Sequence, residues 1–269
     1  MPEPRALQTD DILTERIMDG VALITLNRPR QRNPLSLAMW AETGRLFDDF
    51  GADPDIRCII LTGAGGAFSA GADISEFDAV RRTIDDGRAY DRTEEACQRA
   101  INQCPKPTIA AISGPCFGGA VGVALSCDFR IADETAYFAI PAARLSNVYG
   151  ISETRALFDA VGAAVAKEVL FTGRRYSVEE AHRVGFATHL AGDDRDALAA
   201  ACDFAAGMAK AAPLTIQGAK FVIGAISRGE IDEKRYEIER LMDDAMASED
   251  YKEGVKAFAE KRDPVFRGK

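Results

Sequence analysis

Several residue types that enzymes commonly use are scarce in this sequence. Only two of its 269 residues are histidines, His182 and His189, which leaves little room for a His-rich metal site or an imidazole-based triad. The six cysteines stand at unrelated spacings, mostly in apolar runs, and form no C-x-x-C pair. We therefore expect buried, reduced thiols and no metal site.

Basic charge and long apolar runs are scarce as well. The chain has 33 Lys and Arg against 42 Asp and Glu, a formal net charge of −9, which argues against general binding to nucleic acid or anionic lipid. No stretch of 18 apolar residues occurs, and the opening MPEPRALQTDD lacks the apolar core of a signal peptide. We expect a cytoplasmic protein with neither a membrane nor a nucleic-acid partner.

Strands and helices alternate along the first two-thirds of the chain. Segments 12–18 and 21–26 flank an Asp-Gly pair, which is a strong signal for a hairpin. Short apolar strands at 58–61 and 108–112 are each followed by a glycine-rich loop and then by helical sequence. This alternation predicts an α/β chain whose strands are largely parallel and buried.

The pattern changes near residue 195. Ser177 and Glu180 form a capping box, and Gly185 is placed to end that helix. Beyond it the pattern is helical almost without interruption. We divide the chain into an α/β body, residues 1–195, and a helical C-terminal region, residues 196–269.

Two glycine-rich segments, residues 63–74 and 114–122, follow the apolar strands. Small residues let a ligand approach the backbone, and the first amides of a helix can bind an anion or a developing oxyanion. Neither segment has the Lys-Ser or Lys-Thr of a phosphate-binding loop, and neither fits a dinucleotide fingerprint. Alone, these segments would be interpreted as tight turns that pack helices on strands.

Taken together, five segments resemble the crotonase (enoyl-CoA hydratase/isomerase) superfamily in their order and spacing. They are Leu26-Asn27-Arg28-Pro29 with Asn33-Pro34-Leu35; residues 68–74; residues 114–128; residues 170–174 with Ser177, Ala181 and Gly185; and Glu253-Gly254 with residues 258–262. The resemblance implies a crotonase-like spiral of repeated ββα units with a helical C-terminal trimerisation region, in a homotrimer or a hexamer of two trimers. It also implies an acyl-CoA thioester substrate, with no cofactor beyond the CoA moiety and no metal.

The resemblance also implies roles for individual residues. The N–H groups of Ala72 and Gly119 would form an oxyanion hole for a thioester enolate, where losing one donor typically costs ~10²–10³ in rate. The positions that match CoA-binding residues of the family are Arg28, Ala70, Ala72, Ile74, Phe258 and Lys261. Packing of the last helix explains Phe258 equally well, and Lys261 can be a helix-end charge.

Both glutamates that members of the family use to hydrate enoyl-CoA are missing. Gly122 and Ala142 stand at their positions. A decarboxylase needs no base, so we favour decarboxylation or thioester hydrolysis by an acyl-CoA lyase of this family. Tyr149 matches a tyrosine of the methylmalonyl-CoA decarboxylase branch, but that branch has a histidine where this chain has Ala72.

Three side chains are candidates to replace the glutamates: Tyr149, Arg144, which could bind a substrate carboxylate, and Glu153, which could be a base. Each also has a structural explanation, as a packed ring, a surface ion pair and a first-turn helix charge respectively. An enoyl-CoA hydratase that uses these residues is one alternative function, and a non-catalytic acyl-CoA-binding protein is another. We expect Asp73 to cap a helix and both histidines to be structural.

Overall fold

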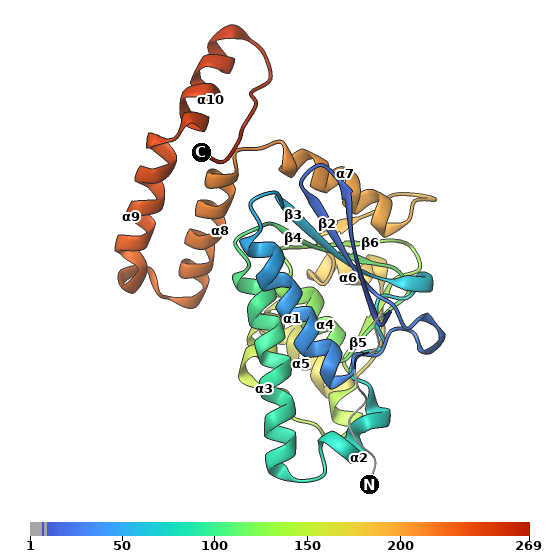
Figure 1. Cartoon of the computed structure of the whole chain (residues 1–269). Helices are drawn as coiled ribbons and strands as arrows, with labels where there is room; N and C mark the ends of the chain where they lie inside the picture. Colours follow the sequence, from blue (N-terminus) through green and yellow to red (C-terminus); the bar gives the residue numbers. More distant parts are fainter. Residues whose placement is uncertain (1–6, 8–9) are drawn as a thin grey trace.

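The computed structural model describes residue 7 and residues 10–269. Its larger sheet has six strands in the order β1-β2-β3-β4-β6-β9, and its smaller sheet has the order β5-β7-β8 (Figure 1). The strands are β1 Ile12–Met18, β2 Val21–Leu26, β3 Cys58–Gly63, β4 Thr108–Ile112, β5 Pro115–Phe117, β6 Phe129–Ala132, β7 Tyr137–Ala139, β8 Tyr176–Ser177 and β9 His189–Leu190. Strands β1 and β2 form the predicted antiparallel hairpin, and the larger sheet is otherwise parallel. The prediction of an α/β fold is confirmed.

Ten α-helices are found in the described residues. They are α1 Leu37–Ala52, α2 Phe77–Val80, α3 Ile84–Gln103, α4 Gly119–Ser126, α5 Ile151–Thr172, α6 Val178–Val184, α7 Ala197–Ala209, α8 Pro213–Arg228, α9 Ile231–Ala247 and α10 Glu249–Glu260. The predicted capping box is present, since Ser177 Oγ accepts from the Glu180 amide and the Glu180 carboxylate accepts from the Ser177 amide. Gly185 ends α6 in the left-handed conformation, as expected.

The larger sheet separates two apolar cores because successive residues along each strand point to opposite faces. On β2, Ala22 and Ile24 face the core that contains α1, α3 and α4, whereas Val21 and Leu23 face α7. Helix α7 contributes alanines spaced four residues apart to that second core. The elements that carry the candidate site all lie on the first side.

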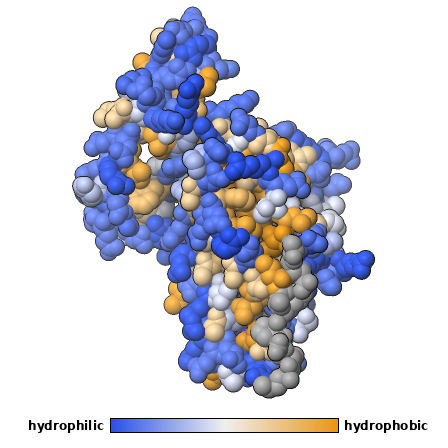
Figure 2. All heavy atoms as spheres, viewed as in Figure 1, coloured by the Kyte–Doolittle hydropathy of each residue, from blue (hydrophilic) through white to orange (hydrophobic). Residues whose placement is uncertain are grey.

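The predicted C-terminal helical region consists of two parts that lie in different places. Helix α7 packs on the sheet, whereas α8, α9 and α10 project away from the body (Figure 1). On the face drawn in Figure 2 these projecting helices are mostly hydrophilic with scattered apolar side chains. Helix α7 begins at Ala197, and the projecting part begins with α8 at Pro213. Within the described residues no single helix is long and apolar enough to span a membrane, and α7 and α8 reach that length only as a pair bent by 108°.

The C-terminal tail folds back along α10. The Asp250 carboxylate accepts hydrogen bonds of 2.7 Å from both the Arg267 and the Gly268 amides, and the Phe266 carbonyl accepts from Arg57. Asp250 is 5% exposed, so these bonds satisfy a buried charge. All six cysteines are free thiols, and all except Cys202 are buried.

Candidate active site

The two glycine-rich segments lie side by side at the ends of β3 and β4. Ser69 pairs with Cys116 in a parallel bridge, and Gly71 has φ +92°. A β-carbon on Gly71 would lie 2.5 Å from the Phe117 carbonyl oxygen and 3.5 Å from the Gly119 nitrogen. Only glycine allows this approach, which brings the residue before Ala72 against the start of α4.

The amides of Ala72 and Gly119 are both outside the hydrogen-bond ladders around them. Gly119 is the first residue of α4, so its N–H has no partner within the helix. Across the Leu35–Ala72 bridge, the amides of Leu35 and Asp73 make the bonds, and the Ala72 N–H donates to none of the described residues. Two such donors on adjoining segments suit an oxyanion hole.

Asn33 holds the first glycine-rich loop in place. Its Nδ2 donates to the carbonyls of Ala64 at 2.9 Å and Ala67 at 2.6 Å, while its Oδ1 accepts from the Arg28 amide. Asn33 is fully buried. The Asn-Pro pair in the sequence is therefore a structural support of the loop that carries Ala72.

The Arg28 guanidinium makes its polar contacts inside the protein. Its Nη1 lies 2.7 Å from Asp73 Oδ2 and 2.8 Å from the Pro34 carbonyl oxygen, and both charged side chains are buried. Burial acts to raise the pKa of Asp73, but hydrogen bonds from Ser75 and Arg28 lower it below its ordinary value. Asp73 accepts from the Ser75 amide at 3.1 Å, which is the capping role we predicted.

Glu94, on α3, is a carboxyl group that our sequence analysis missed. A β-carbon on Gly119 would overlap Glu94 Oε1, so this oxygen lies directly against the Gly119 backbone. The residue is 9% exposed. Burial, together with the neighbouring charge of Glu153, raises the pKa of Glu94 to about 9 and keeps the carboxyl protonated at neutral pH.

Glu153, in the first turn of α5, lies close enough to Glu94 for each carboxyl to shift the pKa of the other. Its Oε2 also accepts from the Gly150 amide at 3.0 Å. Burial raises the pKa of Glu153, whereas the hydrogen bond from the Gly150 amide and the nearby Glu94 and Gln98 side chains oppose that rise. Because the pKa of both carboxyls is raised, and that of Glu94 to about 9, the pair holds at least one proton at neutral pH.

The Tyr149 hydroxyl lies at the same place, 3.7 Å from where a β-carbon on Gly118 would stand. Burial raises the pKa of Tyr149, and the charges of Glu153 and Glu94 raise it further, so the hydroxyl remains a neutral donor. Two of the three replacement candidates, Tyr149 and Glu153, are thus brought together beside Gly118 and Gly119.

The Gln98 side chain of helix α3 fills the space that a side chain at position 122 would need. A β-carbon on Gly122 would lie 2.6 Å from Gln98 Nε2 and 3.3 Å from its Cδ. Glu94 and Gln98 are four residues apart on α3, and Gly119 and Gly122 are three apart on α4, so two polar side chains cover two glycines. Ala142, at the other vacant position, is 5% exposed.

The remaining candidates lie elsewhere or on the surface. Arg144 is exposed, and its Nη2 is 3.4 Å from the Thr172 carbonyl oxygen at the end of α5. Ile74 is 67% exposed and Phe258 88% exposed. Lys261 ends α10 in the left-handed conformation. These positions are accessible to a ligand, but the structure does not join them to the carboxyl pair.

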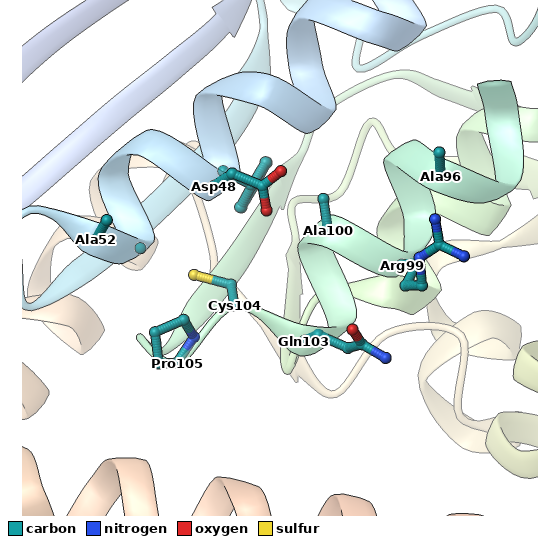
Figure 3. Close-up of a pocket in the computed structure, with 10 residues that line it drawn as sticks. Asp48, Ala52, Ala96, Arg99, Ala100, Gln103, Cys104 and Pro105 are labelled. Carbon is teal, nitrogen blue, oxygen red and sulfur yellow. The ribbon is translucent and has the colours of Figure 1, made fainter.

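The two histidines have structural surroundings. His182 Nδ1 lies 3.2 Å from the Ala187 carbonyl oxygen, and His189 packs against the rings of Phe129 and Phe204. A cavity of about 470 Å³ between α1 and α3, drawn in Figure 3, contains Asp48, Arg99 and Cys104 in its lining. It shares no residue with the site around Gly119.

A periodic signal for Glu94 was present in the sequence. Tyr90, Cys97 and Ile101 are buried at helical spacing on α3, and position 94 falls on the same face. A carboxylate on the apolar face of a helix is rarely tolerated unless it is paired or functional. The partner, on α5, is remote in sequence, so only the structure identifies the pair.

Comparisons with known proteins identify the family of this chain. The family model described as enoyl-CoA hydratase/isomerase matches residues 16–269. The chain is 34% identical to Bacillus subtilis YngF, covering 96% of this chain and 99% of YngF, and 34% identical to (E)-benzylidenesuccinyl-CoA hydratase of Thauera aromatica, covering 95% and 99%. A crystal structure of a Hyphomonas neptunium protein assigned to the same family has 38% identity and a TM-score of 0.89, covering 95% of this chain and 97% of that one. This chain belongs to the enoyl-CoA hydratase/isomerase family.

Proposed function

We propose that the protein hydrates an enoyl-CoA thioester, with Glu94 and Glu153 in place of the usual two glutamates. The observation that carries the proposal is a pair of carboxyls beside the start of α4: the buried Glu94, which lies against the Gly119 backbone, and its half-buried neighbour Glu153. Our preference for decarboxylation or thioester hydrolysis depended on a site without carboxylates. Because two carboxyls are present, hydration through substitute residues becomes the better-supported alternative.

The two carboxyls would have different catalytic roles, one as the base and the other as the acid. The amides of Ala72 and Gly119 would hold the thioester oxygen as it gains charge. Glu153 would take a proton from water while the water oxygen bonds to the β-carbon, and neutral Glu94 would then give its proton to the α-carbon of the enolate. The proton on Glu153 would then pass to the neighbouring Glu94, which restores both groups. The net change is addition of one water across the double bond.

Tyr149 has a supporting part in this scheme. Its neutral hydroxyl, beside Gly118, can donate to the thioester region or to the attacking water. Arg144, which lies near Thr172, takes no part in the scheme.

The test is hydration of crotonyl-CoA, followed by loss of the enoyl absorbance. We expect Glu94→Gln and Glu153→Gln each to lower kcat by ~10²–10⁴, the usual effect of an acid–base group. Glu134→Gln, at an exposed position outside the site, is the matched control and should leave kcat unchanged.

Methylmalonyl-CoA separates the alternatives. If the protein decarboxylates methylmalonyl-CoA, and Glu94→Gln does so at the same rate, the result would favour a decarboxylase over a hydratase. Rapid crotonyl-CoA hydration that survives both glutamine substitutions together would refute the assignment. Tight CoA binding without turnover of any acyl-CoA would identify a non-catalytic binder.

We also propose that α8, α9 and α10 join subunits in a homotrimer or hexamer. These projecting helices expose large apolar side chains, including Ile223, Ile231, Met242 and Met246. Light scattering on the purified protein tests this assembly, and a monomeric mass at micromolar concentration would contradict it.

A further inference from the structure

A cavity with basic walls lies at the end of the larger sheet opposite the glycine-rich loops. Its volume is about 220 Å³, and four of its lining residues are basic: Arg57, Lys106, Arg267 and Lys269. None of the described residues that line it is acidic, although the whole chain has a net charge of −9. A cavity of this charge in an acidic protein favours an anionic ligand.

The position of this cavity separates it from the site around Gly119. Arg57 stands directly before β3 and Lys106 two residues before β4, whereas the glycine-rich loops follow the other ends of these parallel strands. At ~3.3 Å per residue, the length of β3 places the cavity ~20 Å from the oxyanion hole. The C-terminal tail and the start of α8, which lie side by side, complete its walls (Figure 1).

Lys106 is the buried charge of this cavity. It is 9% exposed, and its ammonium makes no hydrogen bond or ion pair with any of the described residues. Burial lowers the pKa of Lys106, and the neighbouring charge of Arg57 lowers it further. The charge of Asp53 acts in the opposite direction, but that carboxylate is already bound to Arg16 at 2.6 Å. A buried charge without a partner costs free energy, which a bound anion would recover.

The start of α8 is a second feature that favours an anion. The first two turns of this helix contribute four lining residues: Pro213, Leu214, Ile216 and Gln217. The N-cap residue is Ala212, so no side chain caps the helix. The first amides of such a helix have no partner within it, and its dipole attracts negative charge.

The other basic side chains are available to a ligand. Arg57 Nη2 donates to the Phe266 carbonyl oxygen at 3.1 Å, and within the described part of the chain its guanidinium has no ion pair. Arg267 and Lys269 are exposed on the tail. Asp250 binds the main-chain amide of Arg267, so the guanidinium of that residue takes no part in holding the tail.

We propose that this cavity binds a phosphate group. Two guanidinium forks, two ammonium groups and a helix N-terminus together offer the charge-assisted hydrogen bonds that phosphate accepts. The cavity holds several waters of ~30 Å³ each, so a phosphate group fits with waters around it. The inference is independent of the hydration reaction.

The phosphate group belongs either to inorganic phosphate or to a small organic phosphate monoester. Apolar residues, among them Ile56, Met208 and Leu214, also line the cavity and can contact the organic part of a monoester. In both cases the bound group would join the body of the protein, the start of α8 and the C-terminal tail.

Isothermal titration calorimetry with inorganic phosphate tests the site, with NaCl used to keep the ionic strength constant. We expect saturable binding, and a melting temperature that rises with phosphate concentration because the ligand binds the folded state. Phenyl phosphate distinguishes the two sources. If it binds more tightly than inorganic phosphate, the site takes a monoester; if it binds equally or less tightly, the site takes inorganic phosphate.

Lys106→Met keeps the length of the side chain and removes its charge. It should weaken phosphate binding by about tenfold or more, the usual effect of losing a hydrogen bond to a charged group. Because the substitution also removes an unpaired buried charge, the variant should melt no lower than the wild type in phosphate-free buffer. A residue with a purely structural role would lower the melting temperature instead. Lys167→Met makes the same change of charge at an exposed position of α5 and should bind phosphate as the wild type does.

Arg267→Gln, at an exposed position, provides the same test with a smaller loss of affinity if Lys106→Met does not fold, as judged by circular dichroism. A melting temperature and a titration that respond to phosphate no more than to NaCl would overturn the proposal. Phosphate binding that both variants leave unchanged would also overturn it, because the ligand would then bind elsewhere. Hydration of crotonyl-CoA is measured separately, so failure of one proposal leaves the other standing.

Discussion

Replacing Glu94 with glutamine should make the protein more stable at alkaline pH. The pKa of Glu94 is raised from an ordinary 4.5 to about 9 in the folded state, so the folded protein binds a proton that the unfolded chain has lost. The contribution of this proton to the free energy of unfolding is fully present below pH 4.5 and is lost as the pH rises toward 9. Each pH unit in that window corresponds to 1.36 kcal/mol. Between pH 5 and pH 8 the loss from this one group is about 4 kcal/mol.

Glutamine is neutral at every pH and can still donate to Glu153. The free energy of unfolding, measured by urea titration at a fixed protein concentration, should therefore be similar for the wild type and Glu94→Gln at pH 5. At pH 8 the variant should be more stable by up to about 4 kcal/mol. Subtracting the free energy of unfolding of the wild type from that of the variant cancels the titration of the groups that both proteins share. Glu134→Gln controls for a general loss of negative charge. A difference that stays constant from pH 5 to pH 8 would refute the buried, protonated Glu94.

Three further predictions concern close contacts. Gly122→Ala should destabilise the protein by ~1–2 kcal/mol, because the cost of overpacking against Gln98 exceeds the gain in helix propensity. In a Gln98→Ala background this clash is removed, and urea titration should show that the same substitution stabilises the protein by up to ~1 kcal/mol. Gly71→Ala should lower both stability and kcat for crotonyl-CoA, since its β-carbon would lie 2.5 Å from the Phe117 carbonyl oxygen at φ +92°; wild-type values of both would contradict the geometry of the hole. Asp250→Ala should cost ~1–3 kcal/mol and make the C-terminal tail sensitive to limited proteolysis, whereas an equally resistant tail would show that this carboxylate does not hold it.

Local patterns predicted the elements of the fold well. The hairpin before residue 26, the buried strands and the capping box at Ser177 each depend on residues close in the chain, and the structure has all three. The approach of the two glycine-rich loops was suggested by the resemblance to a family. Its physical reason, the closeness of Gly71 to Phe117, required coordinates.

The acid–base part of the site was only half predictable. Glu153 could be named because it follows the family's second catalytic stretch. Glu94 could not be paired with it, because the two residues lie 59 positions apart, on different helices, and meet only when α3 and α5 pack around α4. From the sequence, Gly122 and Ala142 were assigned to the positions of the family's two glutamates. That assignment gave no information about which helix fills the space.

The placement of α7 on the far face of the sheet has a practical consequence for protein engineering. Its core contacts come from Ala197, Ala201 and Ala205, which meet the strand residues that point away from the glycine-rich loops. Substitutions along this alanine row would change how closely α7 approaches the sheet without altering a side chain of the carboxyl pair. The thermal tolerance of the protein can therefore be adjusted from one face while its chemistry is varied from the other, and libraries for the two properties can be built and combined independently.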